Sequence, residues 1–172
     1  MVAYVVARQI YGSEIKMVCK AIQDAFFLPK RSWRKPLHEM AYEGLMSRKW
    51  TGIGLFTRQK ELVAYLDYKR EDDTGIEIGI CLTIEKYRNQ GYMQSLFRFL
   101  FDTYPNCSFR ICTYENNAAM IQCIKRLGFR EDHRLINDRI DGTCTIYYIK
   151  TMIDVSETEC PIEDINESDV SI

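Results

Sequence analysis

Hydrophobic residues along this chain follow two spacings, one typical of strands and one typical of helices. In several short segments apolar and polar residues alternate or apolar residues run together, which favours β-strands. The expected strands are 2–7, 51–57, 62–68, 76–83, 108–114, 129–139 and 143–150. Elsewhere apolar residues recur every three or four positions, as on the buried face of a helix. The expected helices are 13–27, 37–48, 90–104 and 117–127.

The order of these elements predicts an α+β fold with a mixed α/β sheet. Strand 76–83, a helix and strand 108–114 form a βαβ unit, and its crossover makes the two strands parallel. Strands 51–57 and 62–68 read as a hairpin, and the last two strands turn at Asp141-Gly142. We expect one domain over 1–150, with a twisted, mostly antiparallel central sheet, one parallel pair and about four flanking helices.

Composition and charge separate a globular body from an acidic tail. The chain of 172 residues is 47% hydrophobic, which suits one folded domain. Segment 151–172 holds seven acidic residues and no Lys or Arg, so we expect a largely disordered tail. The rest of the chain has 23 basic and 17 acidic residues, a balance that suits an anionic ligand. Without an apolar run long enough for a membrane span or a signal-peptide pattern, we expect a cytoplasmic protein with no membrane partner.

Cysteine and histidine residues give little support to a metal site or to disulfides. The seven cysteines include no C-x-x-C pair, and several lie in apolar stretches where a buried thiol is ordinary. The two histidines, His38 and His133, are far apart in the sequence. We therefore expect no metal.

The most informative motif lies between strand 76–83 and the following helix. A turn there would place unpaired backbone amides and the positive end of the helix dipole around an anion such as a diphosphate. Glycine in this turn lets the backbone approach the phosphate oxygens. The residues of the turn are Arg88, Asn89, Gln90, Gly91, Tyr92 and Met93.

A second motif follows at 117–129. Asn116 or Asn117 is a good helix N-cap, and Gly128 can supply the left-handed residue that ends the helix. An apolar stripe runs along one face of the helix between these two ends. The segment closes with Leu-Gly-Phe at 127–129.

The two motifs together resemble those of the GNAT (Gcn5-related N-acetyltransferase) superfamily. The turn is similar to its Arg/Gln-x-x-Gly-x-Gly/Ala sequence, with Arg88 and Gly91 matching and Met93 departing from the pattern. Segment 117–129 is similar to its Asn-helix-Leu-Gly-Phe segment. Strand 76–83 resembles the superfamily's fourth strand, and its Glu-Ile-Gly-Ile sequence is closest to the ribosomal-protein and spermidine acetyltransferase branch.

The resemblance implies an enzyme that transfers the acetyl group of acetyl-CoA, its cosubstrate, to a primary amine by direct attack on the thioester. It implies that the 88–93 turn holds the diphosphate, that the fourth strand pairs with the pantetheine arm at Cys81, Leu82 and Thr83, and that Asn117 contributes to the cofactor site. The amide of Leu82 would stabilise the carbonyl oxygen.

The expected base is Glu77, because acetyl transfer requires a neutral amine and some members of the superfamily place a catalytic Glu on this strand. Partial burial would raise its pKa, whereas a structural interpretation has it pair with a nearby cation. Strict alternation places Glu77, Gly79, Cys81 and Thr83 on one face of the strand, and Ile76, Ile78, Ile80 and Leu82 on the other.

The proton donor for the leaving thiolate is less clearly marked. Many members of the superfamily carry a Tyr on the helix after the Asn, where this chain has Ile124. Tyr148 is the candidate that we adopt, with Tyr114, Tyr147 and solvent as alternatives.

Two other functions are compatible with the sequence. One is an acyl-CoA-binding regulator without catalysis, because the helix Tyr is absent. The other is a nucleic-acid-binding module that uses the basic loop 30–35, but this loop is short and isolated, so we do not expect a nucleic-acid partner. The expected partner is an amine acceptor, either a small molecule or a protein amine, and a homodimer is compatible with the sequence.

Overall fold

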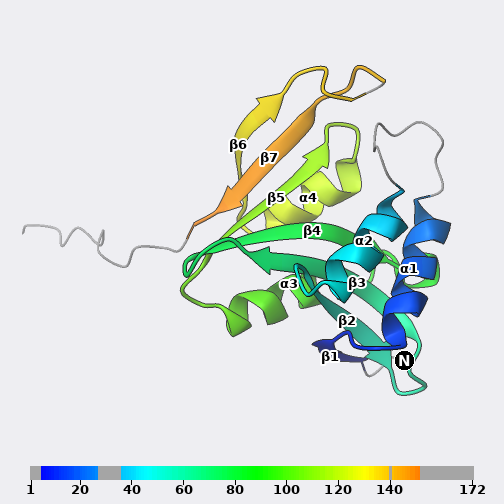
Figure 1. Cartoon of the computed structure of the whole chain (residues 1–172). Helices are drawn as coiled ribbons and strands as arrows, with labels where there is room; N and C mark the ends of the chain where they lie inside the picture. Colours follow the sequence, from blue (N-terminus) through cyan, green and yellow to red (C-terminus); the bar gives the residue numbers. More distant parts are fainter. Residues whose placement is uncertain (1–4, 27–35, 140, 152–172) are drawn as a thin grey trace, which may run out of the picture.

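The architecture is a twisted mixed sheet with helices on both faces (Figure 1). The structure is a computed structural model that describes residues 5–26, 36–139 and 141–151. The basic loop 30–35 and the acidic tail beyond residue 151 lie outside these residues, so the predictions about them stay predictions. The seven strands of the described sheet follow the order β1-β2-β3-β4-β5-β7-β6.

The elements agree in number and order with those expected from the hydrophobic pattern. The strands are β1 (Val5–Gln9), β2 (Thr51–Thr57), β3 (Leu62–Arg70), β4 (Gly75–Thr83), β5 (Ser108–Tyr114), β6 (Arg130–Leu135) and β7 (Thr145–Lys150). The helices are α1 (Glu14–Ala25), α2 (Leu37–Met46), α3 (Tyr92–Thr103) and α4 (Ala118–Arg126). A short 3₁₀ turn, η1 (Glu85–Tyr87), was not expected and links β4 to the turn before α3.

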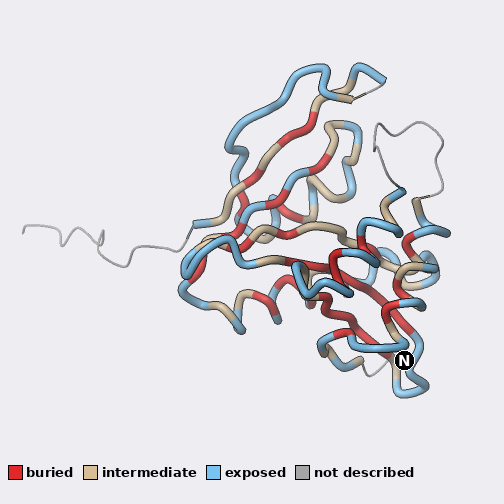
Figure 2. Tube along the Cα trace, in the orientation of Figure 1, coloured by how far each residue is buried: buried red, intermediate tan, exposed pale blue. Residues whose placement is uncertain are grey.

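Two hydrophobic clusters lie on opposite faces of the sheet. One packs α3 and α4 against the strands through residues such as Leu96, Phe97 and Ile124. The other packs α1 and α2 against the opposite face through residues such as Val18 and Leu45. Figure 2 shows that the buried positions concentrate in the central strands and on the inner sides of these helices. The sheet is therefore the middle layer of three, as the predicted fold class requires.

Strand β4 contains a β-bulge opposite Asp67 of β3. Leu66 pairs with Cys81 and Tyr68 pairs with Ile78, so two residues of β4 face one residue of β3. The bulged residues are Gly79 and Ile80.

The bulge makes the predicted alternation along β4 wrong. Ile76 and Ile78 pack in the cluster with α3 and α4, whereas Ile80 and Leu82 pack in the cluster with α1 and α2. The one extra residue shifts the two-residue period, so every side chain after it changes face.

The parallel pair predicted from the βαβ unit is present, but it is short. β4 pairs with β5 from Gly75–Ser108 to Ile78–Ile111. After the bulge, from Cys81 to Thr83, the described pairing of β4 is with β3. The two strands therefore separate at the bulge, and this separation positions the site.

Candidate active site

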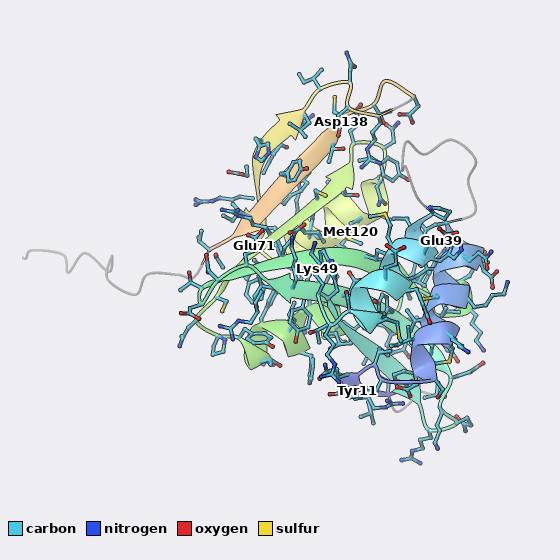
Figure 3. All side chains as sticks on the ribbon, viewed as in Figure 1. Tyr11, Glu39, Lys49, Glu71, Met120 and Asp138 are labelled. Carbon is cyan, nitrogen blue, oxygen red and sulfur yellow. The ribbon has the colours of Figure 1, made fainter. Side chains whose placement is uncertain are left out.

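A cleft of about 290 Å³ lies where β4 and β5 separate. Its lining comes from β3, β4 and β5, from the start of α4, from the first half of α2 and the residue after α1, and from the loops before β2 and β7. Met120 of α4, labelled in Figure 3, is on the β5 side of the cleft. The residues that line it are Phe26, Leu37, Met40, Ala41, Trp50, Asp67, Glu77, Ile78, Gly79, Ile80, Cys81, Ile111, Cys112, Thr113, Tyr114, Asn117, Met120 and Arg139.

Glu77, the expected base, lines this cleft. Its Oε2 atom is 2.5 Å from the Nζ atom of Lys69, and 38% of its side chain is exposed. The ion pair expected under the structural interpretation is thus present, but Glu77 still faces the cleft. The structure is compatible with both interpretations.

The turn before α3 has the open, glycine-dependent backbone that the motif predicts. Gly91 is the N-cap residue with φ of 80°, and Asn89 also has a positive φ of 61°. The first bond of the helix runs from the Ser95 amide to the Gly91 carbonyl at 3.0 Å, so the amides of residues 92–94 precede it. A Cβ atom built on Gly91 meets no heavy atom within 4 Å, which means that the space beside the turn is open.

The remaining side chains of the turn leave this space open. Arg88 donates to the Thr83 carbonyl at 3.3 Å at the end of β4, and Gln90 donates to the Lys86 carbonyl at 3.3 Å in η1. Tyr92 is buried, and the partly buried Met93 packs against the cluster beneath α3. Met93 stands where the family pattern has a small residue. Its side chain packs against the core, and its backbone amide stays at the turn.

The three expected residues of the β4 edge differ in their surroundings. Cys81 lines the cleft, and burial raises the pKa of its thiol well above the usual value, which favours the neutral thiol over the thiolate. Leu82 is buried in the cluster with α1 and α2, so it can offer only backbone groups. The Thr83 carbonyl accepts the Arg88 bond and ties the turn to the strand.

Asn117 is the N-cap of α4, as predicted, and it also lines the cleft. Its Oδ1 atom accepts the Met120 amide at 3.4 Å, and its Nδ2 atom donates to the Thr113 hydroxyl at 3.0 Å. Gly128, with φ of 84°, follows the end of the helix, which confirms the expected left-handed residue. Ile124 is fully buried and belongs to the core.

Tyr148, the adopted proton donor, lies apart from these residues. It is 1% exposed within the cluster under α3 and α4, and burial raises its pKa. The cleft-lining residues of the described chain do not include it. Among the alternative donors, Tyr114 lines the cleft and Tyr147 stacks on His133 with ring centroids 4.4 Å apart. The role of Tyr148 stays a prediction.

Most of the cleft lining was missed in the sequence, including Trp50, Asp67 and Arg139. Asp67 carried a readable signal, because it is a charged residue inside the apolar segment 62–68. Trp50 precedes a strand and Arg139 lies in a loop, where neither residue type is unusual. Only the fold brings these two to the cleft.

The described residues contain no group of three or more His, Cys, Asp and Glu side chains that could hold a metal ion. None of the helices in 5–26, 36–139 and 141–151 combines the length and apolar character that a membrane span requires.

Several solved structures with the same fold carry the names of acetyltransferases. The chain is 16% identical to the ribosomal-protein-S18-alanine N-acetyltransferase of Escherichia coli, with a TM-score of 0.72 over 90% of this chain and 98% of that one. Arabidopsis thaliana NAA60, solved with a bisubstrate analogue, is 16% identical with a TM-score of 0.70 over 86% and 97% of the two chains. The spermidine N-acetyltransferase of Vibrio cholerae, solved with CoA and spermine, is 12% identical with a TM-score of 0.67 over 86% and 95%.

At these identities the structural likeness shows a shared fold. Comparison with functionally curated proteins gave no significant sequence match. The family model of the acetyltransferase (GNAT) family, however, matches residues 16–129, about two thirds of the chain. The chain therefore belongs to the acetyltransferase (GNAT) family, a family of acyltransferase enzymes.

Proposed function

We propose that this protein transfers the acetyl group of acetyl-CoA to a primary amine bound in the cleft between β4 and β5. The observation that carries the proposal is the end of parallel pairing at Ile78–Ile111. Beyond it, residues 79–81 of β4 line a cleft, and the open turn at Gly91 follows after the end of the same strand. A strand edge and a helix N-terminus in succession suit a ligand with a linear arm and a diphosphate.

The residues present fit acetyl-CoA. The amides of residues 92–94, with Gly91 and the positive φ of Asn89, would bind the diphosphate. Backbone groups of Cys81, Leu82 and Thr83 would pair with the pantetheine arm. Asn117 would border the arm from the β5 side of the cleft. Acetyl-CoA, when bound, supplies the activated acetyl thioester.

The chain itself must prepare the amine and balance the charges of the reaction. Glu77 is the proposed base, and its part-exposed carboxylate can return the proton to bulk water after each turnover. The Leu82 amide is the proposed donor to the acetyl oxygen. Tyr148 is the proposed donor of a proton to the thiolate of the departing coenzyme. The alternative donors are Tyr114, which lines the cleft, Tyr147 and water.

Thiol release from acetyl-CoA, measured against a panel of amines, tests this proposal. The expected result is amine-dependent release of one thiol for each acetylated product, with the product identified by mass spectrometry. Saturable binding of acetyl-CoA without turnover on any amine would instead favour a regulator that binds acyl-CoA.

A further inference from the structure

Asp67 is the only charged side chain that is fully buried among the residues that the structure describes, with 3% of its surface exposed. Its Oδ1 atom accepts the Ile80 amide at 2.6 Å, and its Oδ2 atom accepts the Tyr65 hydroxyl at 2.9 Å. No cation is seen in these two contacts. A buried carboxylate that is held by neutral donors keeps a negative charge available for a further partner.

This carboxylate borders the cleft because of the bulge in β4. A Cβ atom on Gly79 would lie 2.3 Å from the Oδ1 atom of Asp67, so glycine is needed for the strand to pass this close. Asp67 is itself among the residues that line the cleft. Each carboxylate oxygen can accept more than one hydrogen bond, and therefore both oxygens keep capacity for a ligand.

An apolar wall stands next to the carboxylate. The Trp50 ring lies against Gly79, with its Cζ3 atom 2.7 Å from the position of a built Cβ. Phe26 and Ala41, which belong with Trp50 to the cluster of α1 and α2, also line the cleft, as does Met40. A ligand group that lies beside Asp67 on this side therefore meets aromatic and aliphatic carbon.

We propose that Asp67 and Trp50 form the acceptor subsite, in which Asp67 binds the ammonium group and the apolar wall receives an adjacent hydrocarbon group. The proposal rests on the proposed acetyl transfer and narrows its substrate class to primary amines with an apolar substituent. Polyamines are disfavoured, because a second ammonium group would lie against the carbon of this wall, and the other cleft carboxylate, Glu77, is already paired with Lys69.

The two cleft carboxylates have surroundings that suit different tasks. Asp67 is enclosed and fixed by two hydrogen bonds, which suits binding in one geometry. Glu77 is part-exposed and can exchange protons with water. The subsite thus adds a binding residue beside the proposed base.

The charge state of Asp67 makes acceptor binding depend on pH. Burial raises its pKa to about 6, although the bonds from Ile80 and Tyr65 act to lower it. The other titratable groups that influence it or are influenced by it are Tyr65 of β3, Cys19 of α1, and Glu77 and Cys81 of β4. Affinity for a cationic amine should be full above pH 7 and should fall as the pH drops through 6.

The test compares n-hexylamine with 1,6-diaminohexane, which has the same chain length and a second ammonium group. Binding to the full chain in the presence of CoA is measured by calorimetry, and kcat and KM are measured separately with acetyl-CoA. We expect hexylamine to bind at least about tenfold more tightly than the diamine. Asp67→Asn keeps an acceptor for the Ile80 amide and should raise the Kd for hexylamine at least about tenfold, with the Kd for acetyl-CoA within about twofold of the wild type.

Asp72→Asn is the matched control. The Oδ1 atom of Asp72 also accepts a backbone amide at 2.6 Å, that of Gly75, but it lies in the β3–β4 turn outside the cleft-lining set. This variant should bind both amines like the wild type.

Unchanged hexylamine affinity in folded Asp67→Asn, or equal affinity for the two amines, would overturn the subsite. If Asp67→Asn binds acetyl-CoA more weakly but binds hexylamine like the wild type, the subsite proposal is wrong, and Asp67 instead shapes β4. If hexylamine binds as described but no acetylated product forms, the subsite stands and the proposed transfer fails.

Discussion

The Asp67 carboxylate accepts the amide of Ile80 at 2.6 Å, and this bond is made at the point where β4 leaves β5. The bulged residues Gly79 and Ile80 would otherwise leave an amide of the strand without its ladder partner. Asp67 satisfies that amide from the neighbouring strand, and the same carboxylate faces the cleft. The geometry of the β4 edge and the charge inside the cleft therefore depend on one side chain.

Replacing Gly91 with alanine should weaken acetyl-CoA binding about tenfold or more, because a side chain and a disfavoured positive φ would disturb the amides of the turn. Gly142 offers a matched control, since it has a φ of 74° and equally open surroundings but lies in the β6–β7 turn. In calorimetric titrations, the affinity for acetyl-CoA should be lower in Gly91→Ala than in the wild type and unchanged in Gly142→Ala. Equal affinities in all three proteins would remove the turn from the binding site.

Much of this arrangement was predictable from local pattern. The turn at Gly91, the N-cap at Asn117 and the parallel pair each depend on signals within a few residues, and all three are present. The bulge was not predicted, because it involves a contact between Asp67 and the neighbouring strand β4, and the two-residue period gave the wrong face for Ile80 and Leu82.

The composition of the cleft was only partly predictable for the same reason. Glu77, Cys81 and Asn117 could be placed by family resemblance, whereas Trp50 and Arg139 reach the cleft only through the packing of distant segments. Tyr148 was adopted without a motif to mark it, and it lies in the core.

Glu77→Gln tests the proposed base. If Glu77 removes the proton from the amine, this variant should flatten the rise of kcat with pH and lower kcat by about 10²-fold or more at neutral pH. Glu71→Gln is a suitable control, because Glu71 also faces a cation, Arg110 at 3.5 Å, but does not line the cleft. A pH profile of Glu77→Gln that overlays the wild type would assign Glu77 to the ion pair with Lys69 alone.

Gly79→Ala should disrupt the cleft, because its Cβ would lie 2.3 Å from Asp67 Oδ1 and 2.7 Å from the Trp50 ring. We expect a loss of about 1–3 kcal/mol in the free energy of unfolding together with weaker amine binding. Gly54→Ala is crowded to a similar degree, at 2.8 Å from Ile10, but lies away from the cleft lining. It should lose stability and keep its affinity for the amine. Denaturant unfolding measures the stability of the two variants, and calorimetry measures their affinity for the amine. An equal loss of amine affinity in both variants would contradict the placement of the acceptor subsite beside Gly79.

The buried charge of Asp67 should cost stability at neutral pH. Its folded-state pKa of about 6 exceeds the ordinary value of 3.8, so the folded protein binds more protons between these values and its stability falls as the pH rises through them. Asp67→Asn removes this dependence. The free energy of unfolding of this variant relative to the wild type should therefore increase between pH 4 and pH 7, by roughly 2 kcal/mol. A constant difference at both pH values would show that the carboxyl is not destabilised by burial.

The central claim is that the turn before α3 and the edge of β4 hold acetyl-CoA for transfer to an amine. Calorimetric titration of acetyl-CoA into the folded full chain tests it most directly. The account predicts saturable binding of one molecule per chain, with competition by CoA and a clear loss of affinity in Gly91→Ala. A folded protein that gives no heat of binding with either nucleotide, confirmed by equilibrium dialysis, would contradict it.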